Sequence, residues 1–167
     1  PIEPRTRVVN SAGDSKAGAL GASWADADGY VGASIDTYRN NYGVTVEPDV
    51  TIDMKRDRAQ FAGERKLSGP IERIEWSASH TRYRHQEVEG SGEVGTTFNS
   101  RGSELRVQAQ HAPLPLAGGA LRGVFGAQLE ELDFSALGEE AFVPDIGTRS
   151  GALFLLEEWK GSALSVN

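Results

Sequence analysis

The chain has 167 residues, a formal net charge of −7 and a hydrophobic content of 38%. The acidic balance and the lack of a basic stripe argue against nucleic-acid binding, and the absence of cysteine excludes disulfides and thiolate metal sites. The longest apolar stretch, Ala152 to Leu156, is far shorter than the roughly 20 residues that a membrane-spanning helix needs.

Alternating apolar and polar residues predict β-strands along most of the chain. The alternation is clearest where Leu105, Val107 and Ala109 are separated by charged or amide side chains. Between Val50 and Gly63 the apolar parity shifts, which predicts a bulge around residues 56–58. The expected strands cover residues 17–25, 29–39, 50–65, 71–85, 102–111, 120–130 and 149–159, and an eighth begins near Ser162.

The expected connections alternate between tight turns and long polar loops. Short connections at one end of antiparallel strands and long ones at the other are typical of outer-membrane barrels. We therefore expect an all-β fold, an antiparallel up-and-down transmembrane β-barrel segment with about 7–8 strands of a larger barrel. The tight turns lie at residues 26–29, 67–70 and 113–119, and the long loops at about 40–49, 86–101 and 131–148.

Aromatic residues gather near both ends of the expected strands. Two such groups are typical of the aromatic belts that mark the two membrane interfaces. The alternative is that Tyr and Trp favour strand ends and cores in any β-protein. The residues are Trp24, Tyr30 and Trp159 near the tight turns, and Tyr38, Tyr42, Tyr83 and Phe134 near the long loops.

Several short segments, in order from about Ser11 to Trp159, resemble the early barrel of TonB-dependent outer-membrane receptors. The similarity is greatest to the branch that includes the zinc-uptake receptor. It rests on the order and spacing of the segments, and none of them is a catalytic signature. The segments are Gly29 to Ser34, Asn41 to Val44, Val50 to Met54, Tyr83 to Glu87, Glu93 to Phe98, His111 to Leu114 and Phe134 to Pro144.

The resemblance implies a barrel of roughly 22 strands that is closed by an N-terminal plug domain. Residues 1–167 would then be a partial barrel domain, and both chain ends look cut, without a signal peptide. The implied location is the cell outer membrane of a Gram-negative cell. The implied partners are outer-membrane lipid and, through missing parts of the chain, the plug domain and a TonB-type energy-coupling protein. The implied cargo is a scarce nutrient such as zinc, haem or a siderophore, and no resident cofactor is expected.

The metal candidates are His85, Glu87 and Glu89, where the fourth strand enters a long loop. Imidazole and carboxylate ligands suit zinc. His80 is five residues from His85, so on a regular strand the two histidines point to opposite faces, and His80 shares the parity of apolar residues. His111 abuts a predicted tight turn, away from ligand entry.

Two charged groups allow alternative interpretations. The acidic residues of the third loop would attract a cation to the mouth, or would simply keep a surface loop soluble. Arg82, Arg84 and Arg101 are candidates for contacts with lipopolysaccharide phosphates at the outer rim. The acidic residues are Glu130, Glu131, Asp133, Glu139, Glu140 and Asp145.

No motif of an enzyme is present: the chain has no nucleophile elbow, phosphate-binding loop or zinc-protease helix, so we expect no catalytic activity. The alternative class is a soluble, lipocalin-like β-barrel that binds a small apolar ligand in its interior. In that case the apolar side chains would face inward and the polar ones would face water. Periodicity alone does not separate the two arrangements, and the family resemblance favours the receptor.

Overall fold

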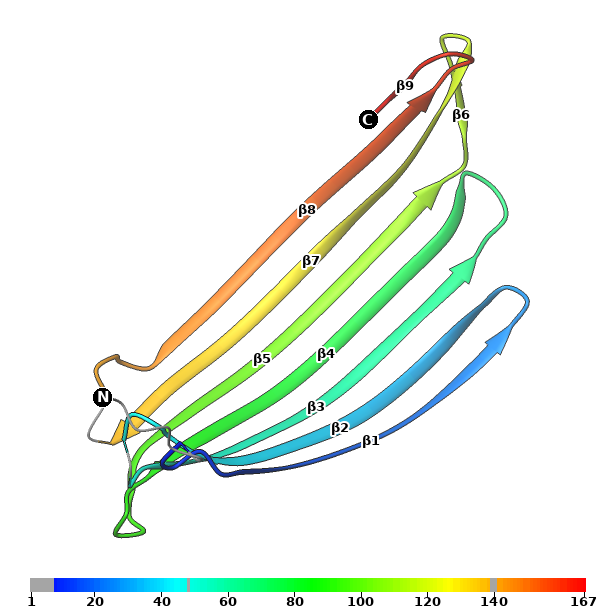
Figure 1. Ribbon diagram of the computed structural model, residues 1–167. Coiled ribbons are helices and arrows are strands. Elements are labelled where there is room, and N and C mark those ends of the chain that lie inside the picture. The colour runs from blue at the N-terminus through cyan, green and yellow to red at the C-terminus, as the bar shows by residue number, and fades with distance from the viewer. Residues whose placement is uncertain (1–7, 48, 139–140) are drawn as a thin grey trace.

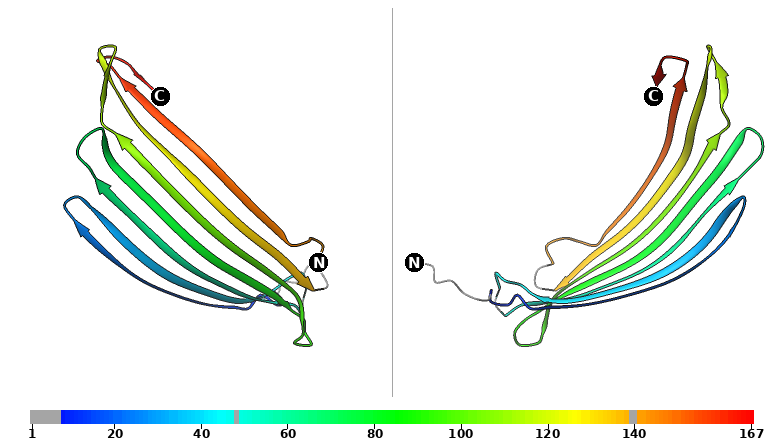
Figure 2. Two further views of the ribbon diagram at one scale, coloured as in Figure 1. Left: turned by 180° about the vertical axis from the view of Figure 1, so that it is seen from behind. Right: turned by 45° about the vertical axis from the view of Figure 1, so that its right-hand side comes forward.

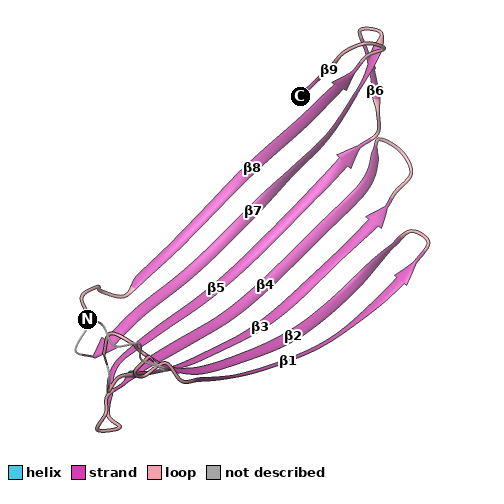
Figure 3. Ribbon diagram, viewed as in Figure 1, coloured by secondary structure: helices cyan, strands magenta, loops and turns pink. Residues whose placement is uncertain are grey.

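The structure is a computed structural model, and it describes residues 8–47, 49–138 and 141–167. The described part is built of β-strands without any helix (Figures 1 and 3). No helix in it is therefore long and apolar enough to cross a membrane. The strands are β1 (Gly13–Asp26), β2 (Gly29–Gly43), β3 (Thr51–Lys66), β4 (Ile71–Val88), β5 (Val94–His111), β6 (Leu114–Leu116), β7 (Gly119–Gly138), β8 (Ile146–Lys160) and β9 (Ser165–Val166).

All nine strands belong to one sheet in the order β1-β2-β3-β4-β5-β7-β8-β9, with β6 paired to β7. Every pairing is antiparallel, and strands adjacent in the sequence pair with each other, except that β5 and β6 both pair with β7. The sheet is a curved, open ribbon whose short turns step progressively along its edge (Figures 1 and 2). The expected all-β, antiparallel up-and-down architecture is confirmed, and an open sheet of this kind is consistent with a segment of a barrel.

The tight turns predicted at residues 26–29 and 67–70 are confirmed, whereas the third, at 113–119, contains the short strand β6 followed by a two-residue turn. In the β1–β2 turn, the backbone N–H of Asp28 donates to the carboxylate of Asp26 at 2.8 Å, as in an Asx turn. Between β6 and β7, Ala117 and Gly118 have φ angles of 47° and 75°. Two successive positive φ angles are typical of the hairpin turns that match the twist of the flanking strands.

The long loops are much shorter than the sequence predicts, because the strands continue into them. Outside the strands, the described parts of these connections are residues 44–47 and 49–50, residues 89–93 and residues 141–145. At the second loop the backbone N–H of Glu89 donates to the carbonyl of Glu93 at 2.9 Å, which closes a compact hairpin. Near these loops one face of the sheet carries mainly charged and polar side chains and the other carries aromatic ones, so the alternation that identifies a strand is weak there.

The predicted bulge at residues 56–58 is wrong. β3 pairs without interruption on both sides from Thr51 to Lys66. The register shifts lie instead at the two ends of the β4–β5 ladder. The parity shift in β3 has another cause: Ile52 and Phe61 lie on opposite faces of the sheet, and each face is apolar in a different half of the strand.

The sheet has no second layer, so it encloses only a small core. Among the described residues, the buried apolar side chains are Ile52 and Ala136, and Thr96 is the buried polar one. All three lie near the long-loop ends of their strands. Many large apolar side chains elsewhere are exposed, including Leu20 at 74% and Leu153 at 88%. An exposed apolar surface of this extent requires a partner.

Candidate functional site

The strand register assigns each side chain to one of two faces, because directly opposed residues in an antiparallel sheet point to the same side. We call the side that carries Leu105 and Val107 the apolar face, and the side that carries Glu104 and Arg106 the polar face. The register places Leu20, Ala22 and Trp24 on the apolar face with Leu105, Val107 and Ala109, as their parity predicts.

On the apolar face, two complete cross-strand rows over seven strands contain no polar side chain. Their large side chains are exposed, as Trp24, Phe61 and Leu129 illustrate at 62%, 45% and 56%. We call these two rows the apolar band. They are Ala22, Ala33, Phe61, Ala78, Leu105, Leu129 and Gly151, and next to them Trp24, Val31, Gly63, Trp76, Val107, Ala127 and Leu153.

The polar face behind this band is mostly hydrophilic on β4 and β5 and in the adjoining half of β7. Its Arg106 donates to Gln108 at 3.0 Å and to Gln128 at 3.2 Å, and Gln108 donates to Glu75 at 2.9 Å. These contacts tie three neighbouring strands, β4, β5 and β7, into one side-chain network. The row of this face that borders the band on its loop side consists of Gly21, Ser34, Gln60, Ser79, Glu104, Glu130 and Ser150.

The network extends towards the short turns through Arg73. Its guanidinium contacts Glu75 at 3.1 Å and donates to Gln110 at 2.7 Å. On the other side, the Arg106 guanidinium lies 4.4 Å from the centre of the Phe154 ring, a cation–π contact. Apart from this ring, the middle of the polar face offers mostly hydrogen-bonding groups and suits contact with water or with a polar partner.

Near the long loops the polar face carries an aromatic cluster, formed by Tyr83, His85, Phe98 and Phe134. The His85 ring is 4.6 Å from Phe98, and Phe98 is 6.4 Å from Phe134. The Tyr83 hydroxyl lies 3.0 Å from Nδ1 of His85. His85 is on the loop side of the apolar band, outside the part of β4 that the band covers, and burial lowers its pKa from the ordinary 6.5. The imidazole is therefore neutral at pH 7.

The three metal candidates are not assembled into a site. His85 and Glu87 share the polar face of β4, whereas Glu89 lies in the hairpin beyond its end. Within residues 8–47, 49–138 and 141–167, no group of three or more His, Asp or Glu side chains is placed to hold a metal ion. The metal role of His85, Glu87 and Glu89 stays a prediction.

The other two histidines lie on the apolar face. His80, as its parity predicts, points away from His85, and its Nδ1 is 2.9 Å from the Ser103 hydroxyl. His111, at the short-turn end, is 3.0 Å from the Glu157 carboxylate of β8. The contact crosses β7 above Gly123, where any Cβ would meet the Glu157 side chain.

The residues of the two expected aromatic belts lie on different faces of the sheet. Trp24 and Trp159 lie on the apolar face towards the short turns, and so does Trp76. An interfacial belt would need this placement, and the first belt stays a prediction. Tyr30 lies on the polar face. The expected second belt is wrong, because its members point to the polar side and join or flank the aromatic cluster; they are Tyr38, Tyr42, Tyr83 and Phe134.

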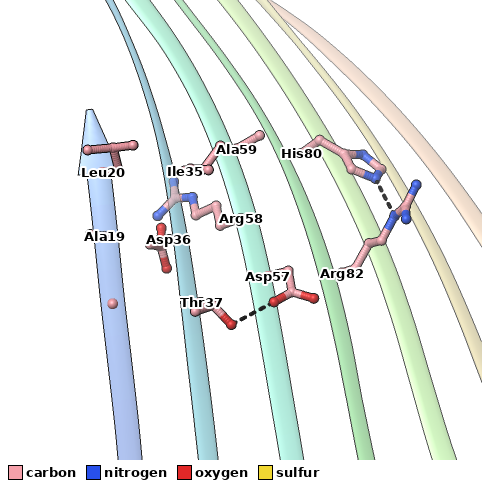
Figure 4. A pocket seen from close by; sticks show the side chains of 11 residues that line it. Ala19, Leu20, Ile35, Asp36, Thr37, Asp57, Arg58, Ala59, His80 and Arg82 are labelled. Carbon is pink, nitrogen blue, oxygen red and sulfur yellow. Dashed lines mark hydrogen bonds between the residues drawn. The ribbon is translucent and has the colours of Figure 1, made fainter. Parts of the chain in front are cut away.

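An open hollow of about 620 Å³ lies where the apolar band gives way to polar side chains (Figure 4). Leu20, Ile35 and Ala59 line its apolar part. Its polar part includes Asp57, which accepts a hydrogen bond from Thr37 at 2.7 Å, and Arg82, whose Nε is 3.4 Å from His80.

The acidic residues of the third loop do not converge. Glu131 forms an ion pair with Arg149 at 2.7 Å, and Glu130 accepts a hydrogen bond from Ser150 on the opposite face. Glu139 and Glu140 lie outside the described residues. Sequence reasoning did not find the polar network or the aromatic cluster, because both depend on which residues of separate strands lie opposite one another.

Comparison with known proteins adds no family assignment. The chain matches no protein-family model, and no curated protein is significantly similar to it. The functional interpretation therefore depends on the two faces of the sheet.

Proposed function

We propose that the chain is a segment of an outer-membrane β-barrel of the TonB-dependent receptor type, which imports a scarce nutrient. The observation that carries the proposal is the apolar band, which crosses seven strands on one face and is backed by a polar network on the other. In membrane barrels the lipid-facing side chains are apolar and the lumen-facing ones are polar.

The placement of aromatic and basic side chains near the long loops favours an apolar face in lipid over the arrangement of a soluble, lipocalin-like barrel. A soluble barrel would place the polar face in water, and the aromatic cluster of Tyr83, His85, Phe98 and Phe134 would then be an outer surface patch. In a soluble barrel, the lysines and arginines at the loop end of the apolar face would also point into the barrel interior. In the membrane arrangement the aromatic cluster lies inside the barrel and these cations lie outside, where water and headgroups solvate them.

The open edges support the proposal that residues 1–167 are part of a larger barrel domain. β1 has no partner on its outer side within the described chain, and β9 covers only Trp159 and Lys160 of β8. Unpaired strand edges are not tolerated in lipid. Further strands would close the barrel, and the polar face would line the lumen around a plug domain that responds to a TonB-type energy-coupling protein.

The cargo we propose is a metal ion or a metal complex, and no catalytic step is involved. The support is the resemblance to the zinc-uptake branch together with the neutral imidazole of His85 on the lumen side. Glu87 shares that face, two residues nearer the loop. The three connections at the loop end would form part of the outer vestibule through which the cargo enters.

Replacing two residues tests the metal assignment. The double variant His85→Ala, Glu87→Ala of the intact receptor should take up less zinc in a cell-based uptake assay, with normal amounts of assembled barrel. The matched control is His80→Ala, which removes a histidine from the opposite face of the same strand and should leave uptake unchanged. Unchanged uptake in the double variant would remove these residues from the transport path, and an intact receptor that carries no metal or haem would refute the cargo.

A further inference from the structure

We propose that the outward side of the sheet binds the phosphate groups of anionic membrane lipid through a row of four cations near the long loops. The inference rests on the proposed function, because it requires the apolar face to lie in a membrane. It adds a lipid-binding site on the outside of the barrel, separate from the lumen and from the cargo.

The four residues Lys16, Arg39, Lys55 and Arg84 lie directly opposite one another on β1, β2, β3 and β4. They share the apolar face, and we call them the cation row. Like charges placed directly opposite in a sheet destabilise it. In a chain with a net charge of −7, an uninterrupted row of this kind requires compensating anions.

The protein compensates the row only in part. Lys16 contacts Asp14 at 3.5 Å, and Lys55 contacts Asp57 at 2.8 Å. Arg39 and Arg84 are exposed, and neither forms an ion pair with any residue of the described chain. The row therefore offers two guanidinium groups to an external anion.

The neighbouring rows do not repeat this excess. Towards the turns, the next row contains Asp57, Arg82, Arg101 and Asp133, which balance. Towards the loops, the next row contains Asp14 and Asp53 with no cation. Behind the row, on the polar face, Arg56 is paired with Asp36 at 2.8 Å. The uncompensated positive charge is thus confined to one line on the outward side.

The height of the row fits a lipid headgroup. Lys16 lies four residues before Leu20, or about 13 Å along the strand, and Leu20 is the apolar side chain on this face of β1 that is nearest the long loops. A strand tilt of about 40° reduces this to about 10 Å along the membrane normal. The headgroup layer is about 5–8 Å thick, and Lys and Arg side chains reach back towards it.

The hollow in Figure 4 lies between the apolar band and the cation row. It offers apolar walls of Leu20 and Ile35 on the side of the apolar band, and polar groups of Thr37, Asp57 and Arg82 on the side of the cation row. This order suits a lipid whose chain lies on the band and whose phosphate lies under the row. Arg39 and Arg84 are suited to such a phosphate, because a guanidinium forms paired hydrogen bonds with phosphate oxygens.

Lipid selectivity tests the proposal directly. The full protein would be reconstituted in phosphatidylcholine vesicles, and the association of spin-labelled phosphatidic acid would be compared with that of spin-labelled phosphatidylcholine. We expect a preference for phosphatidic acid that falls several-fold in the variant R39Q/R84Q and in high salt. The matched control R58Q/R122Q removes the same charge from the polar face and should keep the preference.

The outcomes separate this inference from the proposed function. A protein that inserts into the vesicles but shows no preference, or the same preference in R39Q/R84Q, overturns the lipid site and leaves the barrel intact. If excess inorganic phosphate lowered the association of the labelled lipids and the protein showed no preference for phosphatidic acid, the cation row would bind a soluble anion. That result would overturn the lipid site too. A protein that does not insert contradicts both proposals.

Discussion

At the scale of single residues, glycines let large side chains lie flat across the sheet. A Cβ on Gly63 would meet the Trp76 ring, and a Cβ on Gly126 would meet the Phe154 ring and the carbonyl of Val107. Each ring belongs to the residue directly opposite its glycine. The position of Phe154 over Gly126 is also what brings its ring into contact with Arg106. Glycine at these positions therefore supports packing on both faces.

The close approach at Gly126 predicts a specific loss of stability. Gly126→Ala should destabilise the folded protein by about 1–3 kcal/mol, because the new methyl group forces the backbone of β5 or the Phe154 ring to move. Denaturant unfolding in lipid vesicles, followed by tryptophan fluorescence, measures the change.

The control for this prediction is Gly18→Ala on β1, where a Cβ would have no atom within 4 Å. Its effect should stay within about 0.5 kcal/mol. Equal effects at the two positions would mean that strand propensity, and not packing, determines the outcome.

At the scale of the elements, the period-2 pattern predicts the order and number of the long strands, but not their ends. Around Leu105 and Val107 one face is apolar and the other polar, so the alternation is unambiguous. Beyond His85 the polar face becomes aromatic and the opposite face becomes charged, and the same strand then looks like a loop. The apparent bulge in β3 has this origin, since Ile52 and Phe61 serve opposite faces.

The sequence could predict only those features of the two faces that depend on the spacing of residues within a single strand. The opposite orientation of His80 and His85 follows from their spacing alone and is confirmed. The cation row is different, because Arg39 and Arg84 belong to different strands and their alignment depends on the register of two hairpins. That register is set by the connection between Gly43 and Thr51 and by the turn near Gly69, which local patterns place only approximately.

The apolar band predicts how β5 responds to a charge. In the intact receptor, Val107→Arg should destabilise by about 2–4 kcal/mol if the residue lies near the middle of the bilayer. The reason is that lipid offers the guanidinium neither water nor a counterion. Equilibrium unfolding in vesicles of defined thickness provides the measurement.

The neighbouring substitution Gln108→Arg is the matched control, because it places the same charge on the polar face beside Glu75. It should cost little, since the lumen solvates the new side chain. If Gln108→Arg is the more harmful of the two, the apolar face does not lie in lipid.

At the scale of the whole molecule, the sheet is incomplete in two ways. Its apolar face lacks a covering layer, and its first and last strands lack partners along most of their length. In the proposed receptor, a lipid bilayer would supply the first, and further strands of a closed barrel would supply the second. The staggered turns in Figure 1 fit this arrangement, because strands that close a barrel must tilt and shift in register.

The most direct test of the central claim is the environment of successive positions on β5 in the reconstituted receptor. Spin labels placed singly at positions 104 to 108 would be probed by collision with oxygen, which concentrates in lipid, and with a water-soluble nickel chelate. We predict that labels at 105 and 107 meet oxygen and that labels at 104, 106 and 108 meet the chelate. Chelate contact at both sets of positions, or the reverse alternation, would contradict a lipid-facing apolar band.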